Sequence, residues 1–286
     1  MATMQDIRRR IKSINNLQQV TGAMQAVAAA KLRRAQAQLL AARPYTDKTE
    51  EVLQRLGGRI DTSLHPLLAQ REVSRTGVIV ITSDGGLAGS FNANIIRKAA
   101  DMLAAYDRDA TGVIAVGRKG RDYFRRRDYP LMGDFVGLGD DVSFSMADLI
   151  ANTIVQFYQT GLLDEVYLIY AQYVNTLTQR PVVSRLLPLQ PPESSTADVA
   201  GSEYIFEPSP EAVLDNLLPR YVATLVYRAL LEAKTSEHGA RMTAMDSASR
   251  NAEEMIKDLT LSLNRARQAA ITREISEVVA GADALK

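Results

Sequence analysis

The sequence predicts a long antiparallel two-helix coiled coil, formed by the N- and C-terminal segments, together with a small α/β domain that has a mostly parallel sheet. Three observations support this fold class. Helical periodicity runs through both ends of the chain, short strands alternate with helices in the middle, and the last helix is too long for a compact domain.

The C-terminal segment, residues 211–286, carries the strongest helical pattern. After Pro219 it contains no further proline, and small or apolar residues recur every three or four positions. They are Met242, Met245, Ala248, Ala252, Met255, Leu259, Leu263 and Ala270. Such a helix would be roughly 95 Å long, whereas a compact globule of this chain length is only about 50 Å across. We therefore expect the helix to protrude and to be covered by a partner.

The N-terminal segment, residues 1–56, is predicted to supply the second helix of the coiled coil. Thr3 to about Arg43 has helical periodicity without proline, and its seam is rich in alanine, which allows a close approach of two helices. Pro44 is expected to interrupt this helix and a shorter one to run from Thr46 to Leu56. The alternative is a pair of ordinary amphipathic helices packed on a globule.

The middle of the chain, residues 75–190, is predicted to form a Rossmann-like α/β domain. Apolar, β-branched runs predict buried strands at 77–82, 112–116, 165–171 and 182–189. Helices are expected at 92–106, 119–127 and 143–159 between them, and this alternation indicates a mostly parallel sheet. Residues 191–210 are predicted to be a connector. The final helix is expected to start at Pro208 or Pro210 and to be kinked or divided at Pro219.

Composition excludes several classes of function. The chain has no cysteine, and its only histidines, His65 and His238, are expected to be surface or packing residues. Disulfides, thiolate catalysis and cysteine-ligated metals are thereby excluded. No apolar run is long enough to span a membrane, and the first ten residues do not form a secretory signal. We therefore expect an intracellular protein with no catalytic, cofactor-binding or metal-binding residues.

Two local features were candidates for chemistry. The glycine-rich turn from Asp84 to Gly89 follows a strand and precedes a helix, where α/β domains cradle phosphates. It matches neither the dinucleotide fingerprint nor the P-loop, so a structural turn is favoured. Asp140 and Asp141 are adjacent and are expected to cap the helix that follows Val142.

The charge distribution is uneven, although the net charge is only +1. Residues 1–43 contain eight basic side chains and one acidic side chain, Asp6. In the last helix, Arg265, Arg267 and Arg273 form a basic patch without an intervening acid. A basic pair of helices favours an acidic partner, which could be nucleic acid, an anionic membrane surface or acidic protein loops.

Six stretches of the sequence resemble one known family, the gamma subunit of the rotary F-type ATP synthase, in its bacterial form. They are Ile7–Ile14, Gln19–Thr21 and Ala23–Lys31 in the first helix, Ser83–Asn92 in the middle, and Ser236–Asp246 and Asn264–Ile275 in the last helix. They occur in order across almost the whole chain. Two positions depart from the family pattern, which commonly has lysine where Gly22 stands and arginine where Gly85 stands.

The resemblance implies a central rotor shaft without catalytic activity of its own. Its coiled coil would enter a hexamer of three alpha and three beta subunits, while the α/β domain would join the epsilon subunit and the membrane c-ring. The protein would be peripheral, on the cytoplasmic side of the cell membrane. The implied residues for binding the alpha and beta subunits are Met24, Lys31, Arg33, Arg34, Arg265, Arg267 and Gln268.

Two other classes of function remain open on the residues alone. A nucleotide-using α/β enzyme would bind phosphate at the turn from Asp84 to Gly89. A nucleic-acid-binding coiled coil would use the basic N-terminal helix, and its affinity would fall steeply with salt. Tryptophan is absent and aromatic residues make up 6% of the chain, which disfavours recognition by base stacking.

Overall fold

The computed structural model describes residues 3–57, 65–190 and 210–283. It divides into two compact units: unit 1 comprises Met1–Ala28 and Arg241–Lys286, and unit 2 comprises Ala29–Ala240. The helices α1 (Met4–Gly57) and α5 (Pro210–Asp283) each contribute to both units. The predicted fold class, two long helices with a mostly parallel sheet between them in the sequence, is confirmed.

Unit 2 contains a five-stranded sheet in the order β3-β2-β1-β4-β5. The strands β1 (Thr76–Ile81), β2 (Thr111–Val116), β3 (Leu131–Phe135) and β4 (Glu165–Tyr173) are parallel, and β5 (Gln179–Leu187) is antiparallel to β4. The short β3 was not predicted. Its side chains are only half-buried and it contains Gly133 and Asp134, so it lacks the apolar run by which the other strands were found.

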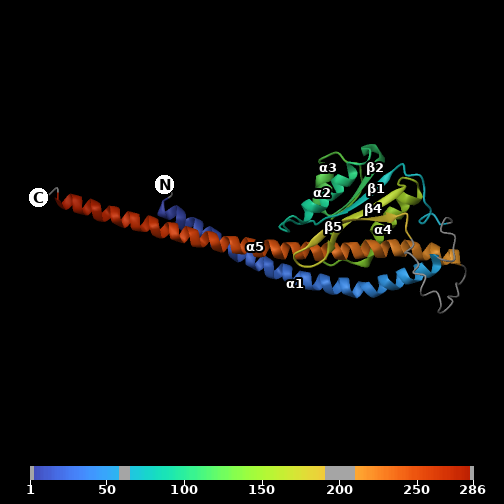
Figure 1. Cartoon of the computed structure of the whole chain (residues 1–286), viewed down its shortest axis with the longest axis horizontal. Coiled ribbons are helices and arrows are strands. Elements are labelled where there is room, and N and C mark those ends of the chain that lie inside the picture. Colours follow the sequence, from blue (N-terminus) through green and yellow to red (C-terminus); the bar gives the residue numbers. More distant parts are fainter. Residues whose placement is uncertain (1–2, 58–64, 191–209, 284–286) are drawn as a thin grey trace. The chain divides into compact units, whose positions relative to one another are not determined.

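Helices cover both faces of the sheet, as Figure 1 shows. Because side chains alternate along a strand, β1 directs Val78 and Val80 into one apolar cluster, and Ile79 and Ile81 into the other. The first cluster contains side chains of α2 (Phe91–Leu103) and α3 (Arg118–Arg125). The second contains side chains of α4 (Phe144–Gln159) and of the parts of α1 and α5 that belong to unit 2.

The predicted break of the N-terminal helix at Pro44 is wrong, because α1 continues through Pro44 to Gly57. A proline inside a helix removes one backbone hydrogen bond. Here the chain is held on both sides of it, since Leu39 and Leu53 are buried in the core of unit 2. The hydroxyl of Thr49 also donates to the carbonyl of Tyr45, at 2.8 Å. Packing therefore offsets the cost of the proline.

Pro219 likewise does not divide the last helix, which runs from Pro210 to Asp283. Leu218 and Val222, on either side of the proline, are buried in the same core. The predicted connector, residues 191–210, lies outside the described residues except for Pro210, where α5 begins. Proline suits the first position of a helix because its missing N–H has no partner there.

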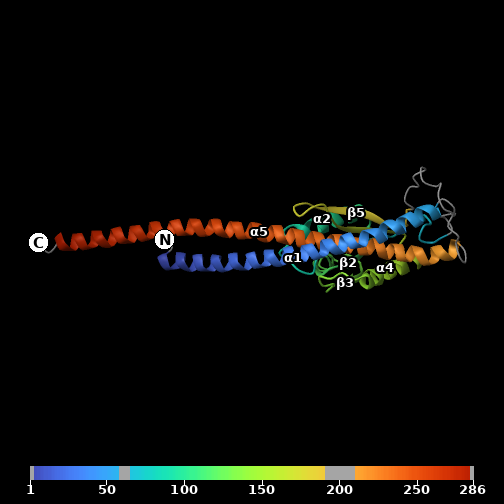
Figure 2. The ribbon, with the colours of Figure 1, turned by 90° about the horizontal axis from the view of Figure 1, so that it is seen from below.

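Unit 1 is a two-helix pair. Thr21 Oγ1 and Ser249 Oγ lie 2.7 Å apart, and Gln25 Nε2 donates to Asp246 Oδ1 at 3.0 Å. The partner's residue number falls as the number along α1 rises, so the two helices are antiparallel. Figure 2 shows them side by side from below, with the end of α5 extending beyond the start of α1. No helix in the described part of the chain is both long and apolar enough to cross a membrane.

Candidate partner-binding surfaces

The last part of α5 carries apolar side chains that this chain does not bury. From Glu253 to Ala280 no side chain is buried, and six large apolar side chains are exposed. They are Met255, Leu261, Ile271, Ile275, Val278 and Val279. Val278 is 71% exposed. Exposed apolar side chains in this number along one helix are typical of a surface that a partner covers.

The first helix of unit 1 shows the same feature on a smaller scale. Leu17, Val20 and Val27 are each more than half exposed, at 54%, 55% and 54%. The residues that unit 1 buries are few: the small or polar Thr21, Ala28 and Ala252, and two large apolar ones, Ile7 and Met245. Small residues let the helices approach closely, and Leu17, Val20 and Val27 are left exposed.

The seven sequence-derived site residues fall into the two units. Unit 1 contains Met24, which is half-buried on α1, and the exposed group Arg265, Arg267 and Gln268 on α5. Because Gln25 bonds Asp246, Met24 lies near that level of α5. The group from Arg265 lies about 19 residues further along, or roughly 30 Å at 1.5 Å per residue. These are two separate surfaces of unit 1.

Unit 2 contains the other three site residues, Lys31, Arg33 and Arg34. The two arginines are exposed on α1. Lys31 is already paired, because its Nζ lies 2.7 Å from Asp140 Oδ2. Its charge is therefore partly neutralised within the chain, which weakens the attraction that it was expected to provide for a partner.

Asp140 was expected to cap a helix, and that prediction is wrong. The N-cap of α4 is Ser143, whose side chain accepts from the backbone N–H of Met146. Asp140 instead lies between two helices, with Lys31 on α1 and, at 3.6 Å, the Nε2 of His238 on α5. The hydrogen bond from Lys31 is the main reason that the pKa of Asp140 is lowered. Asp140 thus ties the loop before α4 to both helices.

Sequence reasoning missed a buried carboxyl group, Glu232 on α5. Arg228 Nε lies 3.3 Å from its Oε1, while its Oε2 has no hydrogen-bond partner among the described residues. Burial raises the pKa of Glu232, opposed by the charge of Arg228. Within a predicted amphipathic helix this glutamate had no signal that would separate it from a solvated one.

The glycine-rich turn after β1 is organised by its own acidic residue. Asp84 accepts from the backbone N–H of Arg118 at 2.9 Å and from that of Gly137 at 3.0 Å. These amides, at the carboxyl ends of the parallel strands, are where a phosphate would bind. A carboxylate occupies them, which favours the structural reading of the turn.

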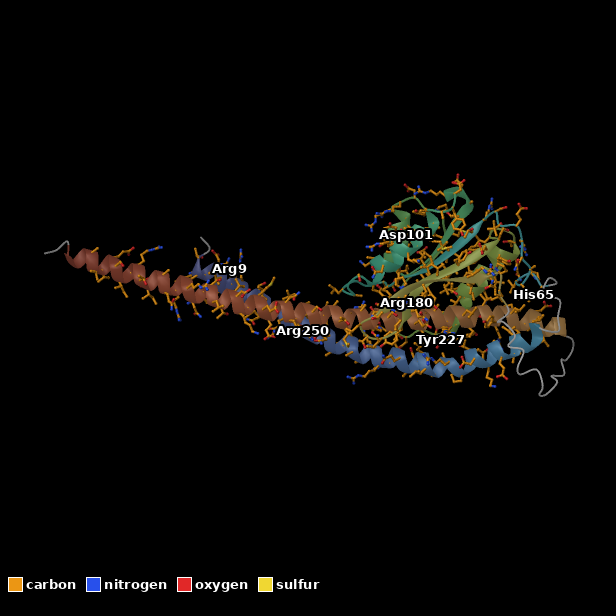
Figure 3. All side chains as sticks on the ribbon, in the orientation of Figure 1. Arg9, His65, Asp101, Arg180, Tyr227 and Arg250 are labelled. Atoms are coloured by element: carbon orange, nitrogen blue, oxygen red, sulfur yellow. The ribbon has the colours of Figure 1, made fainter. Side chains whose placement is uncertain are left out.

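An apolar groove in unit 2 lies beside the aromatic pair Phe144 and Tyr227, whose ring centroids are 5.6 Å apart. Figure 3 labels Tyr227 on α5. The groove is lined by Ala42, Tyr45, Thr46, Phe144, Arg220, Thr224 and Tyr227.

The described residues contain no group of acidic or histidine side chains that could hold a metal ion.

Comparison with known proteins agrees with the distribution of motifs. The family model described as ATP synthase matches residues 3–285. The chain is 54% identical to the ATP synthase gamma chain of Moorella thermoacetica over 286 residues, which cover all of both proteins. The chain belongs to the ATP synthase gamma chain family. The gamma chain of Chlorobaculum parvum is 48% identical over 292 residues, again with full coverage of both.

Solved structures agree with this assignment to the gamma chain family. A chain from the central stalk and c-ring of the Tetrahymena thermophila mitochondrial ATP synthase is 27% identical, with a TM-score of 0.63, and the match covers 80% of this chain and 99% of that one. A chain of the Euglena gracilis mitochondrial ATP synthase has a TM-score of 0.69 at 18% identity, covering 99% and 94%. The second likeness concerns the fold alone.

Proposed function

We propose that the chain is the central rotor shaft of an F-type ATP synthase and performs no chemistry itself. The observation that carries this proposal is the stretch from Glu253 to Ala280, in which no side chain is buried although six large apolar ones are present. A helix with this composition needs a partner protein that surrounds it, which we call the sleeve. Membership of the gamma chain family indicates which subunits form this sleeve.

The sleeve is a hexamer of three alpha and three beta subunits. The α/β domain of unit 2 joins the epsilon subunit and the c-ring of the membrane sector, so the protein is held at the cytoplasmic side of the cell membrane as a peripheral subunit. Symmetric assemblies usually repeat one interface. A single shaft inside a ring of three alpha–beta pairs differs, because each of the three equivalent beta subunits meets a different face of the shaft.

That asymmetry provides a mechanism. Each beta subunit contacts a different side of the helix pair, and the contact free energy therefore favours a different conformation in each. Rotation of the shaft, driven by ion flow through the c-ring, exchanges these contacts among the three subunits. Each subunit in turn is brought to bind, convert and release nucleotide, while the shaft transmits torque.

Two surfaces of the shaft provide the contacts in this proposal. On α1, Met24 faces an acidic loop of a beta subunit, and Arg33 and Arg34 further along the same helix provide the attraction, with a reduced contribution from Lys31. Further along α5, Arg265, Arg267 and Gln268 contact a catalytic subunit near the upper bearing. All three of these side chains are exposed, and guanidinium groups can bind carboxylates with two parallel hydrogen bonds.

The first test is co-purification of the full chain, tagged on an exposed loop of unit 2, from the cells that make it. We expect alpha and beta subunits in threefold excess, with ATPase activity in the purified complex. Recovery of the chain alone, with nucleic acid, or with bound nucleotide and no other subunit would reject the shaft and favour one of the two alternative classes.

The second test compares two arginines of α5 within the assembled complex. Arg267 is exposed in the uncovered stretch, whereas Arg250 is paired with Asp246 at 2.8 Å. We expect Arg267→Ala to lower ATP-driven rotation and ATP synthesis several-fold, the scale of losing one charged contact of about 1–2 kcal/mol. Arg250→Ala is the matched control. Equal rates in the two variants would remove Arg267 from the contact surface.

A further inference from the structure

The strongest concentration of charge in unit 2 lies on α3 and the turn that follows it. Residues 118–128 contain six basic and two acidic side chains. The basic ones are Arg118, Lys119, Arg121, Arg125, Arg126 and Arg127. We call this surface the α3 arginine face. It was not among the basic patches that the sequence indicated, because those lay in the two terminal helices.

Two of the carboxylates near the α3 arginine face are already used by one arginine. Arg121 contacts Asp122 Oδ1 at 2.8 Å and Asp134 Oδ2 at 3.6 Å. Arg118 and Arg126 also lie close to Asp122, since their charges, after the hydrogen bond from Arg121, help to lower its pKa. Several cations thus surround one internal carboxylate, which leaves an excess of positive charge on this surface.

Five basic side chains of the face make no ion pair with any described residue. They are Arg118, Lys119, Arg125, Arg126 and Arg127. All five residues are exposed. Figure 3 shows side chains with nitrogen ends projecting outward from the α2 and α3 layer, where Asp101 is labelled on α2. Like charges held this close destabilise the free surface and favour an anionic partner.

Aromatic rings beneath the face hold the guanidinium group of one of its arginines in place. The guanidinium of Arg127 lies over the ring of Tyr123, 3.8 Å from its centroid, and that of Arg108 lies over Tyr129 at 4.7 Å. Phe124, which is fully buried, makes edge-to-face contacts with both tyrosine rings. A guanidinium that is already ordered loses less rotamer entropy when it binds a carboxylate.

We propose that the α3 arginine face is a docking surface for an acidic protein segment, in which several Asp or Glu side chains lie close together. Five of its six basic residues are arginine, whose planar fork matches the carboxylate group. The surface goes beyond the contacts proposed above, because it names residues of the α/β domain, for which no contact residue was given there, and it does not depend on which subunit the domain joins.

The observations disfavour the two other anionic partners. A bilayer surface is usually bound through apolar side chains as well as charges, and within residues 118–128, all of them described, no large apolar side chain is exposed. Single-stranded nucleic acid is bound by stacking on free aromatic rings. Here the rings of Tyr123 and Tyr129 are covered by arginines.

The test uses the full chain and a peptide of twelve glutamates carrying a fluorophore. The variant R125Q/R126Q removes two unpaired charges from the face. The matched control, R250Q/K257Q, removes two exposed charges of α5 that are each already paired with an acidic residue four positions earlier. We expect at least a tenfold rise in Kd for the first variant and less than a twofold rise for the control. Equal weakening in both would mean that only net charge is sensed, and would overturn the proposal.

Arginine modification followed by mass spectrometry locates the bound probe. The glutamate peptide is expected to protect Arg118, Arg125 and Arg126 from modification, but not Arg180 or Arg250. Phosphatidylglycerol vesicles and a short DNA are tested in parallel at the same ionic strength. Protection of the face by vesicles or DNA without protection by the peptide would overturn the assignment to an acidic protein segment.

Discussion

The two units of the chain are stabilised in different ways. Unit 2 has a dense apolar interior on both faces of its sheet, with side chains such as Ile79, Ile114 and Tyr158 completely buried. In unit 1 the buried residues are few, with Ile7 and Met245 the only large apolar ones among the described residues, and polar pairs such as Thr21 with Ser249 lie in the seam. Unit 2 buries most of its large apolar side chains within itself, whereas unit 1 leaves many of its own exposed.

The apolar side chains of the two units therefore have different roles. Apolar residues in unit 2 fill the space between sheet and helices, where loss of one side chain leaves a cavity. Apolar residues near the end of α5 are exposed, so their contribution to the folding of the isolated chain is small. Their contribution should become large only when another protein covers them. The following predictions test this contrast, beginning with the largest effect.

Removing a buried side chain from the sheet should have the largest effect. Ile114 on β2 is fully buried, whereas Ile275 on α5 is 58% exposed. We expect Ile114→Ala to lower the free energy of unfolding by about 2–5 kcal/mol. Ile275→Ala should change it by less than about 0.5 kcal/mol in the isolated chain. Urea denaturation of both variants checks this, and similar losses would mean that the two units do not differ in this way.

The buried carboxyl group of unit 2 should make its stability depend on pH. Because the pKa of Glu232 is raised above its ordinary 4.5, the folded state favours the protonated form, and stability falls as pH rises through the raised pKa. We expect Glu232→Gln to be more stable than the parent by about 1–2 kcal/mol at pH 8.

Near pH 4 the parent carboxyl is protonated, so the two proteins should have similar stability. Thermal denaturation across this range would show the advantage of Glu232→Gln growing with pH. An advantage that stayed constant from pH 4 to pH 8 would show that ionisation of Glu232 is not its cause.

In the helix pair, a substitution can increase stability. Gly22 lies inside α1, and the nearest atom to an added Cβ would be Ser249 Oγ, at 4.0 Å. Alanine fits there without a clash and favours the helix by about 0.8–1 kcal/mol. We expect Gly22→Ala to slow amide hydrogen exchange in residues 15–30 several-fold. Unchanged exchange there, or slower exchange only in unit 2, would contradict this.

The contact between Asp140 and the two long helices should have the smallest effect, because both Lys31 and Asp140 are substantially exposed, at 40% and 49%. We expect Asp140→Asn to cost about 0.5–1 kcal/mol at pH 7. Since the pKa of Asp140 is lowered from 3.8, the parent's advantage should be complete above that value and be lost as pH falls through the lowered pKa.

Urea denaturation of the Asp140→Asn protein and the parent at pH 7 and at pH 3 measures this advantage. A cost of the substitution that was the same at both pH values would assign it to packing and not to charge.

The sequence was sufficient for the parts of the fold that rest on long, repeated patterns. The periodicity of the terminal segments and the apolar strands at Thr76–Ile81 and Thr111–Val116 corresponds closely to the structure. Prolines misled the prediction where it expected a helix to be interrupted or divided, because Pro44 and Pro219 remain inside helices whose packing on both sides is invisible in the local sequence. Tertiary contacts decided these cases.

The candidate sites could be predicted only in part. The exposed arginines of α5 were evident as a run without acids, but the pairing of Lys31 with Asp140 joins residues more than 100 positions apart. The burial of Glu232 and the α3 arginine face likewise depend on which side of a helix meets the sheet. The local sequence shows which charged residues a helix contains. Which opposite charges they pair with is decided only by the fold.

The final turns of α5, which extend past the beginning of α1 (Figure 1, Figure 2), have a mechanical consequence. Two helices side by side resist twisting together, whereas a single helix of the same length is the more compliant spring. The single-helix end of unit 1 is therefore its more compliant part, able to bend and twist to fit a partner that surrounds it, while the paired part keeps its shape under load.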